Sequence, residues 1–157
     1  MHIQVQNGKL PAIVAKTDFE KIVKDIFKFF KSKGADLKPL PQIVFDCRKQ
    51  KSLVNFCLGF YSPEKKEVHV FIRDRSPNDI VRTIFHELNH HWQNINGRME
   101  KLLEGVTSET ADVGLHEGLT ELEREAEDRG FCMYREWARI HKAKKNPDTQ
   151  FDTVGNE

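Results

Sequence analysis

Two histidines and a glutamate, His86, Glu87 and His90, are the residues of this chain best suited to chemistry. Their four-residue spacing places both imidazoles on one face of a helix, one turn apart, where they can bind a single metal ion. Glu87 lies beside them and can take a proton from water on that metal. Zinc suits such a site because it holds three protein ligands and keeps a position open for an acidified water. The pattern predicts a zinc-dependent hydrolase; the alternative is a structural histidine pair beside an acid.

A catalytic zinc needs a third protein ligand, and the long helix expected in the C-terminal part of the chain offers several glutamates. These are Glu117, Glu121, Glu123, Glu125 and Glu127. At about 100° per residue, Glu121 and Glu125 point nearly opposite to Glu123, and we expect both to pair with arginines of their own helix. Ala126 and Gly130 share the face of Glu123 and are small enough to let this helix approach the motif closely. We therefore predict Glu123 as the third ligand.

His116 is the main rival to Glu123. It lies seven residues earlier and is nearly in register on the same helix face. It could be the third ligand, or it could be a catalytic residue that stabilises the oxyanion of a tetrahedral intermediate. Tyr134 is a weaker candidate for that second role. His91 adjoins the motif but points about 100° away from His90, so we expect it to pack or to lie at the surface.

The motif lies on a helix expected from Ser76 to Asn96. Ser76 can cap the first turn, Pro77 fits the first helical position, and Gly97 can close the last turn. One face of this helix is apolar and consists of Ile80, Val81, Ile84, Phe85, Leu88 and Trp92. The other side carries Thr83, His86, Glu87, His90 and Asn94. We expect the first face to meet the core and the second to face a cleft.

The remaining periodicity predicts an α+β fold with a small antiparallel or mixed sheet. The expected elements are an N-terminal helix at 17–33, strands at 43–45, 53–61 and 67–72, and a long C-terminal helix at about 113–141. The strands at 53–61 and 67–72 should form a hairpin, and residues 98–112 look irregular. We expect a single domain over residues 1–141 and a polar tail over residues 142–157.

Composition limits the classes of function. The formal net charge is +1, with 25 basic and 24 acidic residues, so no basic excess favours a nucleic-acid partner. The cysteines, Cys47, Cys57 and Cys132, form no Cys-x-x-Cys pair and read as reduced thiols. The first eight residues lack the pattern of a signal peptide, and no apolar run approaches membrane-spanning length. These features predict a cytoplasmic protein without a membrane partner.

With these elements in order, the chain resembles the gluzincin-like zincins, and more closely the small metallopeptidases encoded by tailed bacteriophages. The specific stretches are residues 79–82 leading to 86–94, and residues 121–126 leading to 132–137. The resemblance implies a minimal zincin-like domain with His86, His90 and Glu123 as ligands of one zinc ion per chain. It also implies Glu87 as the general base, a protein or peptide substrate, and a place in the host cytoplasm or the virion.

Three functions remain in view from the sequence. The leading one is a peptidase whose strand 67–72 binds an extended peptide by edge addition. The second is a structural or inhibitory phage protein that holds a metal without turnover, with His116 as a possible fourth ligand. The third is a DNA-associated zincin, which the balanced charge disfavours. The sequence does not specify the oligomeric state.

Overall fold

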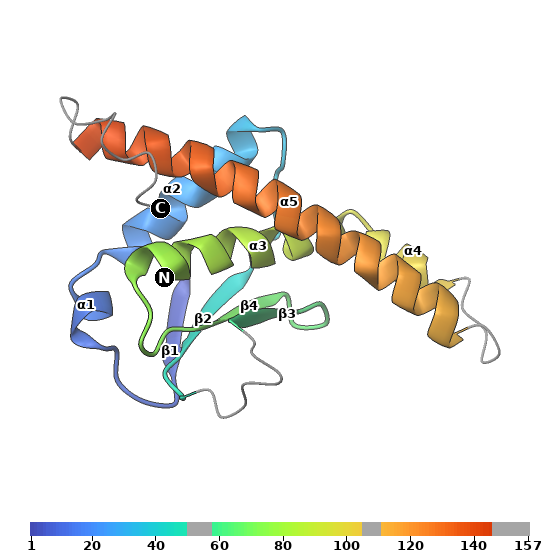
Figure 1. Ribbon diagram of the computed structural model, residues 1–157, viewed down its shortest axis with the longest axis horizontal. Helices are drawn as coiled ribbons and strands as arrows, with labels where there is room; N and C mark the ends of the chain where they lie inside the picture. The colour runs from blue at the N-terminus through green and yellow to red at the C-terminus, as the bar shows by residue number, and fades with distance from the viewer. Residues whose placement is uncertain (50–57, 105–110, 146–157) are drawn as a thin grey trace.

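The computed structural model describes residues 1–49, 58–104 and 111–145, with the backbone alone for residues 102–104, 111–117 and 143–145. The described elements follow the order β1 Ile3–Gln6, α1 Ala12–Ala15, α2 Phe19–Ser32, β2 Gln42–Asp46, β3 Gly59–Ser62, β4 Glu67–Phe71, α3 Pro77–Ile95, α4 Arg98–Glu104 and α5 Ala111–Lys145. Figure 1 shows α3 lying between the sheet and α5, with α2 beside them. The α+β class is therefore confirmed.

The sheet is mixed and has the strand order β1-β2-β4-β3. Strands β1, β2 and β4 run parallel, and β3 pairs antiparallel with β4, from Gly59 opposite Val70 to Ser62 opposite Glu67. The predicted hairpin is confirmed for these residues, whereas residues 53–57 of the predicted strand lie outside the described part of the chain. The prediction that residues 67–72 would form the edge beside the cleft is wrong. Strand β4 is interior because β2 pairs on one side of it and β3 pairs on the other, which leaves β3 at the edge of the described sheet.

Helix α3 begins and ends close to the predicted residues. The Ser76 hydroxyl accepts a hydrogen bond from the Asp79 amide at 3.2 Å, and Pro77 occupies the first turn. The helix gives way after Ile95 to Gly97, whose φ of 77° suits a residue without a side chain. A strong start and a strong stop thus fix the length of the helix that carries the motif.

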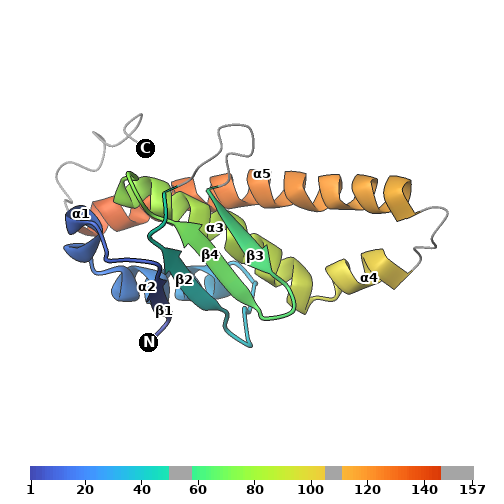
Figure 2. The same ribbon diagram turned by 90° about the horizontal axis from the view of Figure 1, so that it is seen from below.

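Two helical segments differ from the predictions. Residues 98–104 form α4, although Gly105 suggested an irregular stretch; Arg98, Met99, Glu100 and Lys101 are all good helix formers. Helix α5 runs to Lys145, past the boundary expected at residue 141, while residues 146–157 of the predicted tail lie outside the described part. In Figures 1 and 2, α4 and the beginning of α5 extend beyond the sheet.

The core lies where the sheet, α2, α3 and α5 meet. Phe85 of α3 is fully buried, and its ring centroid lies 5.6 Å from that of Phe30, 6.1 Å from that of Tyr134 and 5.8 Å from that of Trp137. The face of α3 predicted to be apolar is the face that packs here, with Trp92 only partly buried. Burial of Phe85 sets the rotation of α3, so the next residue, His86, faces away from the core. None of the helices in the described part of the chain has both the length and the apolar character needed to span a bilayer.

Candidate metal centre

His86 and His90 converge with Glu123 of α5. The Nε2 atom of His86 lies 2.7 Å from Oε1 of Glu123, and Nε2 of His90 lies 2.9 Å from Oε2. One donor atom from each of the three residues falls within a group no wider than 4.8 Å. The structure thus brings together the three predicted ligands, and this group could hold a metal ion.

Small residues on α5 permit this convergence, as predicted. Ala126 is fully buried, and Gly130 lies against the backbone of α3. A Cβ atom built on Gly130 would lie 3.1 Å from the Cα atom and 3.3 Å from the backbone nitrogen of His86. The two helices are therefore as close as their backbones allow at this point, two turns from Glu123.

The Nδ1 atoms of both histidine rings also have polar partners. Nδ1 of His86 lies 3.0 Å from Oε2 of Glu127, and Nδ1 of His90 lies 2.9 Å from Oε1 of Gln93. With each Nδ1–H donated to an oxygen, Nε2 is the nitrogen that each ring turns towards Glu123. Outer acceptors of this kind orient histidine ligands and fix their tautomer in metal sites. We did not predict either acceptor. Gln93 lies three residues after His90, and Glu127 lies four residues after Glu123, so helical spacing could have revealed both.

The charges of the site are strongly coupled. Burial disfavours the imidazolium forms of His86 and His90, but hydrogen bonds to Glu123 and the nearby Glu87 carboxylate outweigh it and raise the pKa of both rings. The same two hydrogen bonds hold the pKa of Glu123 far below its ordinary value. A divalent cation would bind the neutral imidazoles and replace their protons, and two imidazoles with one carboxylate are donors that suit such a cation.

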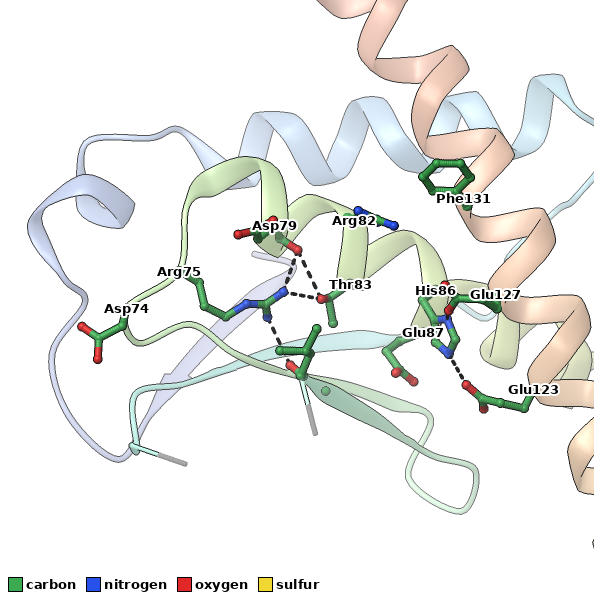
Figure 3. Close-up of a pocket in the computed structure, with 12 residues that line it drawn as sticks. Asp74, Arg75, Asp79, Arg82, Thr83, His86, Glu87, Glu123, Glu127 and Phe131 are labelled. Carbon is green, nitrogen blue, oxygen red and sulfur yellow. Dashed lines mark hydrogen bonds and ion pairs between the residues drawn. The ribbon is translucent and has the colours of Figure 1, made fainter. Parts of the chain in front are cut away.

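Glu87 is the buried acid of the site. Its side chain is only 6% exposed, and Figure 3 shows its carboxylate on the same side of α3 as His86 and Glu123. Burial raises the pKa of Glu87 to about 7, against the opposing effect of the two histidines. A carboxyl group with a pKa near neutrality can both accept and release a proton.

A cleft of about 770 Å³ opens in front of these residues. Its walls come from α3, from the start of β3 at Leu58 and Gly59, and from Glu123, Glu127 and Phe131 of α5. A second hollow of about 750 Å³ is lined by His90 and Glu123, and Met99 of α4 and Leu119 of α5 contribute apolar side chains to it. The candidate metal centre therefore borders both hollows, since His86 lines the first, His90 lines the second and Glu123 lines both.

Arg75 ties the edge of the sheet to α3. Its guanidinium donates to the carbonyl oxygens of Leu58 at 3.2 Å, Phe71 at 2.8 Å and Asp79 at 2.8 Å, and to the Thr83 hydroxyl at 2.6 Å. These bonds hold the beginning of β3 against the helix that carries the motif. Sequence reasoning missed this residue, because its partners are backbone groups that only the tertiary structure brings together.

The other sequence candidates have different outcomes. His116 belongs to α5, but its side chain lies outside the described residues, so its proposed roles stay predictions. His91 is a packing residue, as expected: its Nε2 lies 3.0 Å from the Leu37 carbonyl oxygen, and its Nδ1 lies 2.8 Å from the Tyr61 hydroxyl. Tyr134 is 1% exposed, packs on Phe85 in the core and is not among the residues that line the cleft, so the structure gives no support to its suggested role.

Glu125 also differs from its prediction. We expected it on a solvated face, paired with an arginine of its own helix. Its side chain is instead partly buried and contacts Arg98 of α4 and the amide of Gln93. The helical wheel gave its direction correctly, but it could not show that α4 would cover that side of α5.

Comparisons of this chain with protein-family models, curated proteins and solved structures find no match. The chemistry and the geometry of the described residues therefore carry the functional interpretation that follows.

Proposed function

We propose that this chain is a zinc-dependent, gluzincin-like peptidase with His86, His90 and Glu123 as metal ligands and Glu87 as general base. One observation carries the proposal. The three donor groups converge within 4.8 Å, and the adjacent acid is buried and faces the same cleft. A site with no chemistry to perform would gain nothing from burying an extra carboxylate beside its ligands.

The ligand set favours zinc, at one ion per chain. Two imidazole nitrogens and one carboxylate oxygen match catalytic zinc sites with three protein ligands. When bound, zinc would act as a Lewis acid that polarises a carbonyl group and acidifies water. The orientation of both Nε2 atoms towards Glu123, with both Nδ1 atoms engaged elsewhere, supports this assignment.

The reaction requires proton transfer by Glu87. Glu87 would accept a proton from water as the water oxygen attacks the scissile carbonyl carbon. It would then release that proton to the amide nitrogen as the carbon–nitrogen bond breaks, giving a carboxylic acid and an amine. The second water proton would pass from the acid to the amine, which leaves a carboxylate and an ammonium group. In this scheme His116, whose side chain is not described, is the candidate to stabilise the oxyanion.

Strand β3 supports a peptide as the substrate. It is the edge strand of the described sheet, and its first residue, Gly59, lines the cleft beside Glu87 together with the preceding Leu58. A Cβ atom built on Gly59 would lie 3.6 Å from the Cγ atom of Glu87, so the backbone of β3 runs close to the proposed base. An extended polypeptide added along this edge would bring its amide groups to the site.

Metal content is the first test. Purified wild type, Glu123→Ala, His116→Ala and Glu121→Ala would be compared by elemental analysis after zinc loading and desalting. We expect about one zinc per chain in wild type, loss in Glu123→Ala and retention in the other two variants. Glu121→Ala is the matched control, because it removes an acid from an exposed position of the same helix. Wild type without zinc would end the proposal, and loss only in His116→Ala would move the third ligand.

Peptide hydrolysis is the second test. A library of fluorogenic peptides would be screened with zinc-loaded wild type and Glu87→Gln. We expect Glu87→Gln to retain zinc and to lose activity by about 10²–10⁴-fold, the usual contribution of a general base. Unchanged activity in Glu87→Gln would contradict its role. A metal-loaded wild type that cleaves no peptide would favour a metal-binding protein without turnover.

A further inference from the structure

Gln93 is a buried polar residue with every side-chain polar atom in contact. It is 0% exposed, and its Oε1 lies 2.9 Å from Nδ1 of His90. Its Nε2 donates to the Leu122 carbonyl oxygen at 3.0 Å and to Oε1 of Glu125 at 3.1 Å. A carbonyl and a carboxylate can only accept hydrogen bonds, so the amide nitrogen must face them. Oε1 therefore faces His90 and accepts its Nδ1–H.

This arrangement extends beyond Gln93 to a third helix. Glu125, which accepts from Gln93, also forms an ion pair with Arg98 at the start of α4. The side chains of Arg98 and Glu125 are 36% and 35% exposed, so this outer pair is partly screened by solvent. The contacts run without a gap from Arg98 through Glu125 and Gln93 to His90.

We infer that Gln93 is a positioning residue that sets the metal affinity of the site by fixing the ring of His90. We further infer that Arg98 acts on that affinity through Glu125 and Gln93. The inference rests on the metal centre of the proposed function and is independent of peptide hydrolysis. It gives α4, which the sequence left as irregular, a role in metal binding.

Zinc affinity tests the inference directly. The dissociation constant of zinc would be measured by competition with a fluorescent chelator for wild type, Gln93→Leu, Arg98→Met and the double variant. Gln93→Leu should weaken binding by about 10- to 100-fold, as for other contacts to the outer side of a histidine ligand. Arg98→Met should weaken it by about two- to fivefold, as for a partly exposed ion pair. In the Gln93→Leu background, Arg98→Met should have no further effect, because its route to His90 is already lost.

A spectroscopic readout separates positioning from general damage. Cobalt loaded in place of zinc would report the ligand geometry through its visible absorption bands. The bands should change in Gln93→Leu and stay unchanged in Asn94→Ala. Asn94 is the matched control, because this neighbouring amide bonds to Tyr61 and Pro63 instead of a ligand. Circular dichroism of the metal-free variants would confirm that each is folded.

The outcomes are separable. Wild-type zinc affinity and cobalt spectrum in Gln93→Leu would overturn the inference and leave the proposed function standing. An Arg98→Met effect that persists undiminished in the Gln93→Leu background would overturn the route through Gln93. Should Gln93→Leu fail to fold, unchanged zinc affinity in Arg98→Met would overturn that route. Failure of wild type to bind zinc would overturn both proposals, whereas zinc binding without peptidase activity would remove only the proposed function.

Discussion

Substitution of Gly130 tests whether close packing of α5 on α3 is what places Glu123. In Gly130→Ala the new methyl carbon would lie 3.1 Å from the Cα atom of His86. Carbon atoms in contact normally lie about 3.5–4.0 Å apart, so α5 would have to withdraw by roughly half an ångström. The neighbour is helix backbone, which cannot turn aside as a flexible side chain would.

The effect on stability is a difference of opposing terms. Alanine is favoured over glycine inside a helix by about 1 kcal/mol, whereas overpacking costs about 1–3 kcal/mol. The free energy of unfolding should therefore fall by no more than about 2 kcal/mol in Gly130→Ala. For a chain of this size, this lowers Tm by at most about 8 °C. Gly130→Val adds two more carbons without a larger gain in helix propensity and should cost more.

Metal affinity should respond more strongly than stability. Glu123 lies two helical turns before Gly130, and ligand distances in metal sites are held within about 0.2 Å. A shift of roughly half an ångström should weaken zinc binding by about tenfold, the lower end of the range seen when ligand orientation is disturbed. Gly130→Val should bind more weakly than Gly130→Ala.

The assay would combine zinc competition with thermal unfolding in excess chelator, with Glu121→Ala as the control on the same helix. The reasoning is refuted if Gly130→Val binds zinc as tightly as wild type while remaining folded. In that case the position of Glu123 would not depend on the approach of the two helices at Gly130.

Three further predictions concern the framework around the site. Burial raises the pKa of Asp46, but hydrogen bonds from Arg48 and other groups outweigh this effect and lower the pKa to about 2. The carboxylate therefore contributes about 2 kcal/mol to the free energy of unfolding above about pH 4, and this contribution is lost as the pH falls from about 4 to 2. Asp46→Asn should make the free energy of unfolding less dependent on pH in this range. Urea unfolding at pH 7, 4 and 3 would measure this, and an unchanged pH slope would contradict it. Gly59→Ala should lower Tm, because its Cβ would lie 2.5 Å from the His69 carbonyl oxygen; a variant as stable as wild type would mean that β3 can move freely. Phe85→Ala should cost about 3–5 kcal/mol in urea unfolding, and a loss below 1 kcal/mol would show that this ring is not central to the core.

The local part of the site could be read from the sequence. The spacing of His86 and His90 fixes their relative position on any helix, and Ser76, Pro77 and Gly97 mark where that helix begins and ends. These signals lie within a few residues of the atoms they control. The choice of Glu123 needed one further step, from the direction of each glutamate on α5 and the small residues beside it.

What the sequence did not reveal depends on contacts between distant segments. Arg75 bonds to backbone oxygens of Leu58, just before β3, of β4 and of α3, and no spacing rule predicts such partners. The parallel pairing of β2 with β4 joins segments more than twenty residues apart, yet this pairing places β4 inside the sheet and leaves β3 at its edge. The role of Gln93 likewise depends on α4 and α5 reaching the same side of His90.

The core and the candidate metal centre share one cause. Phe85 of α3 contacts the rings of Tyr134 and Trp137 on α5. The next residue of α3, His86, contacts Glu123, which is also on α5. Apolar packing therefore joins α5 to α3 beside the candidate metal centre. Packing that fixes the two helices in this way would reduce the ordering cost of binding an ion between them. Small changes at Gly130 or Gln93 should therefore weaken metal binding more than they lower the free energy of unfolding.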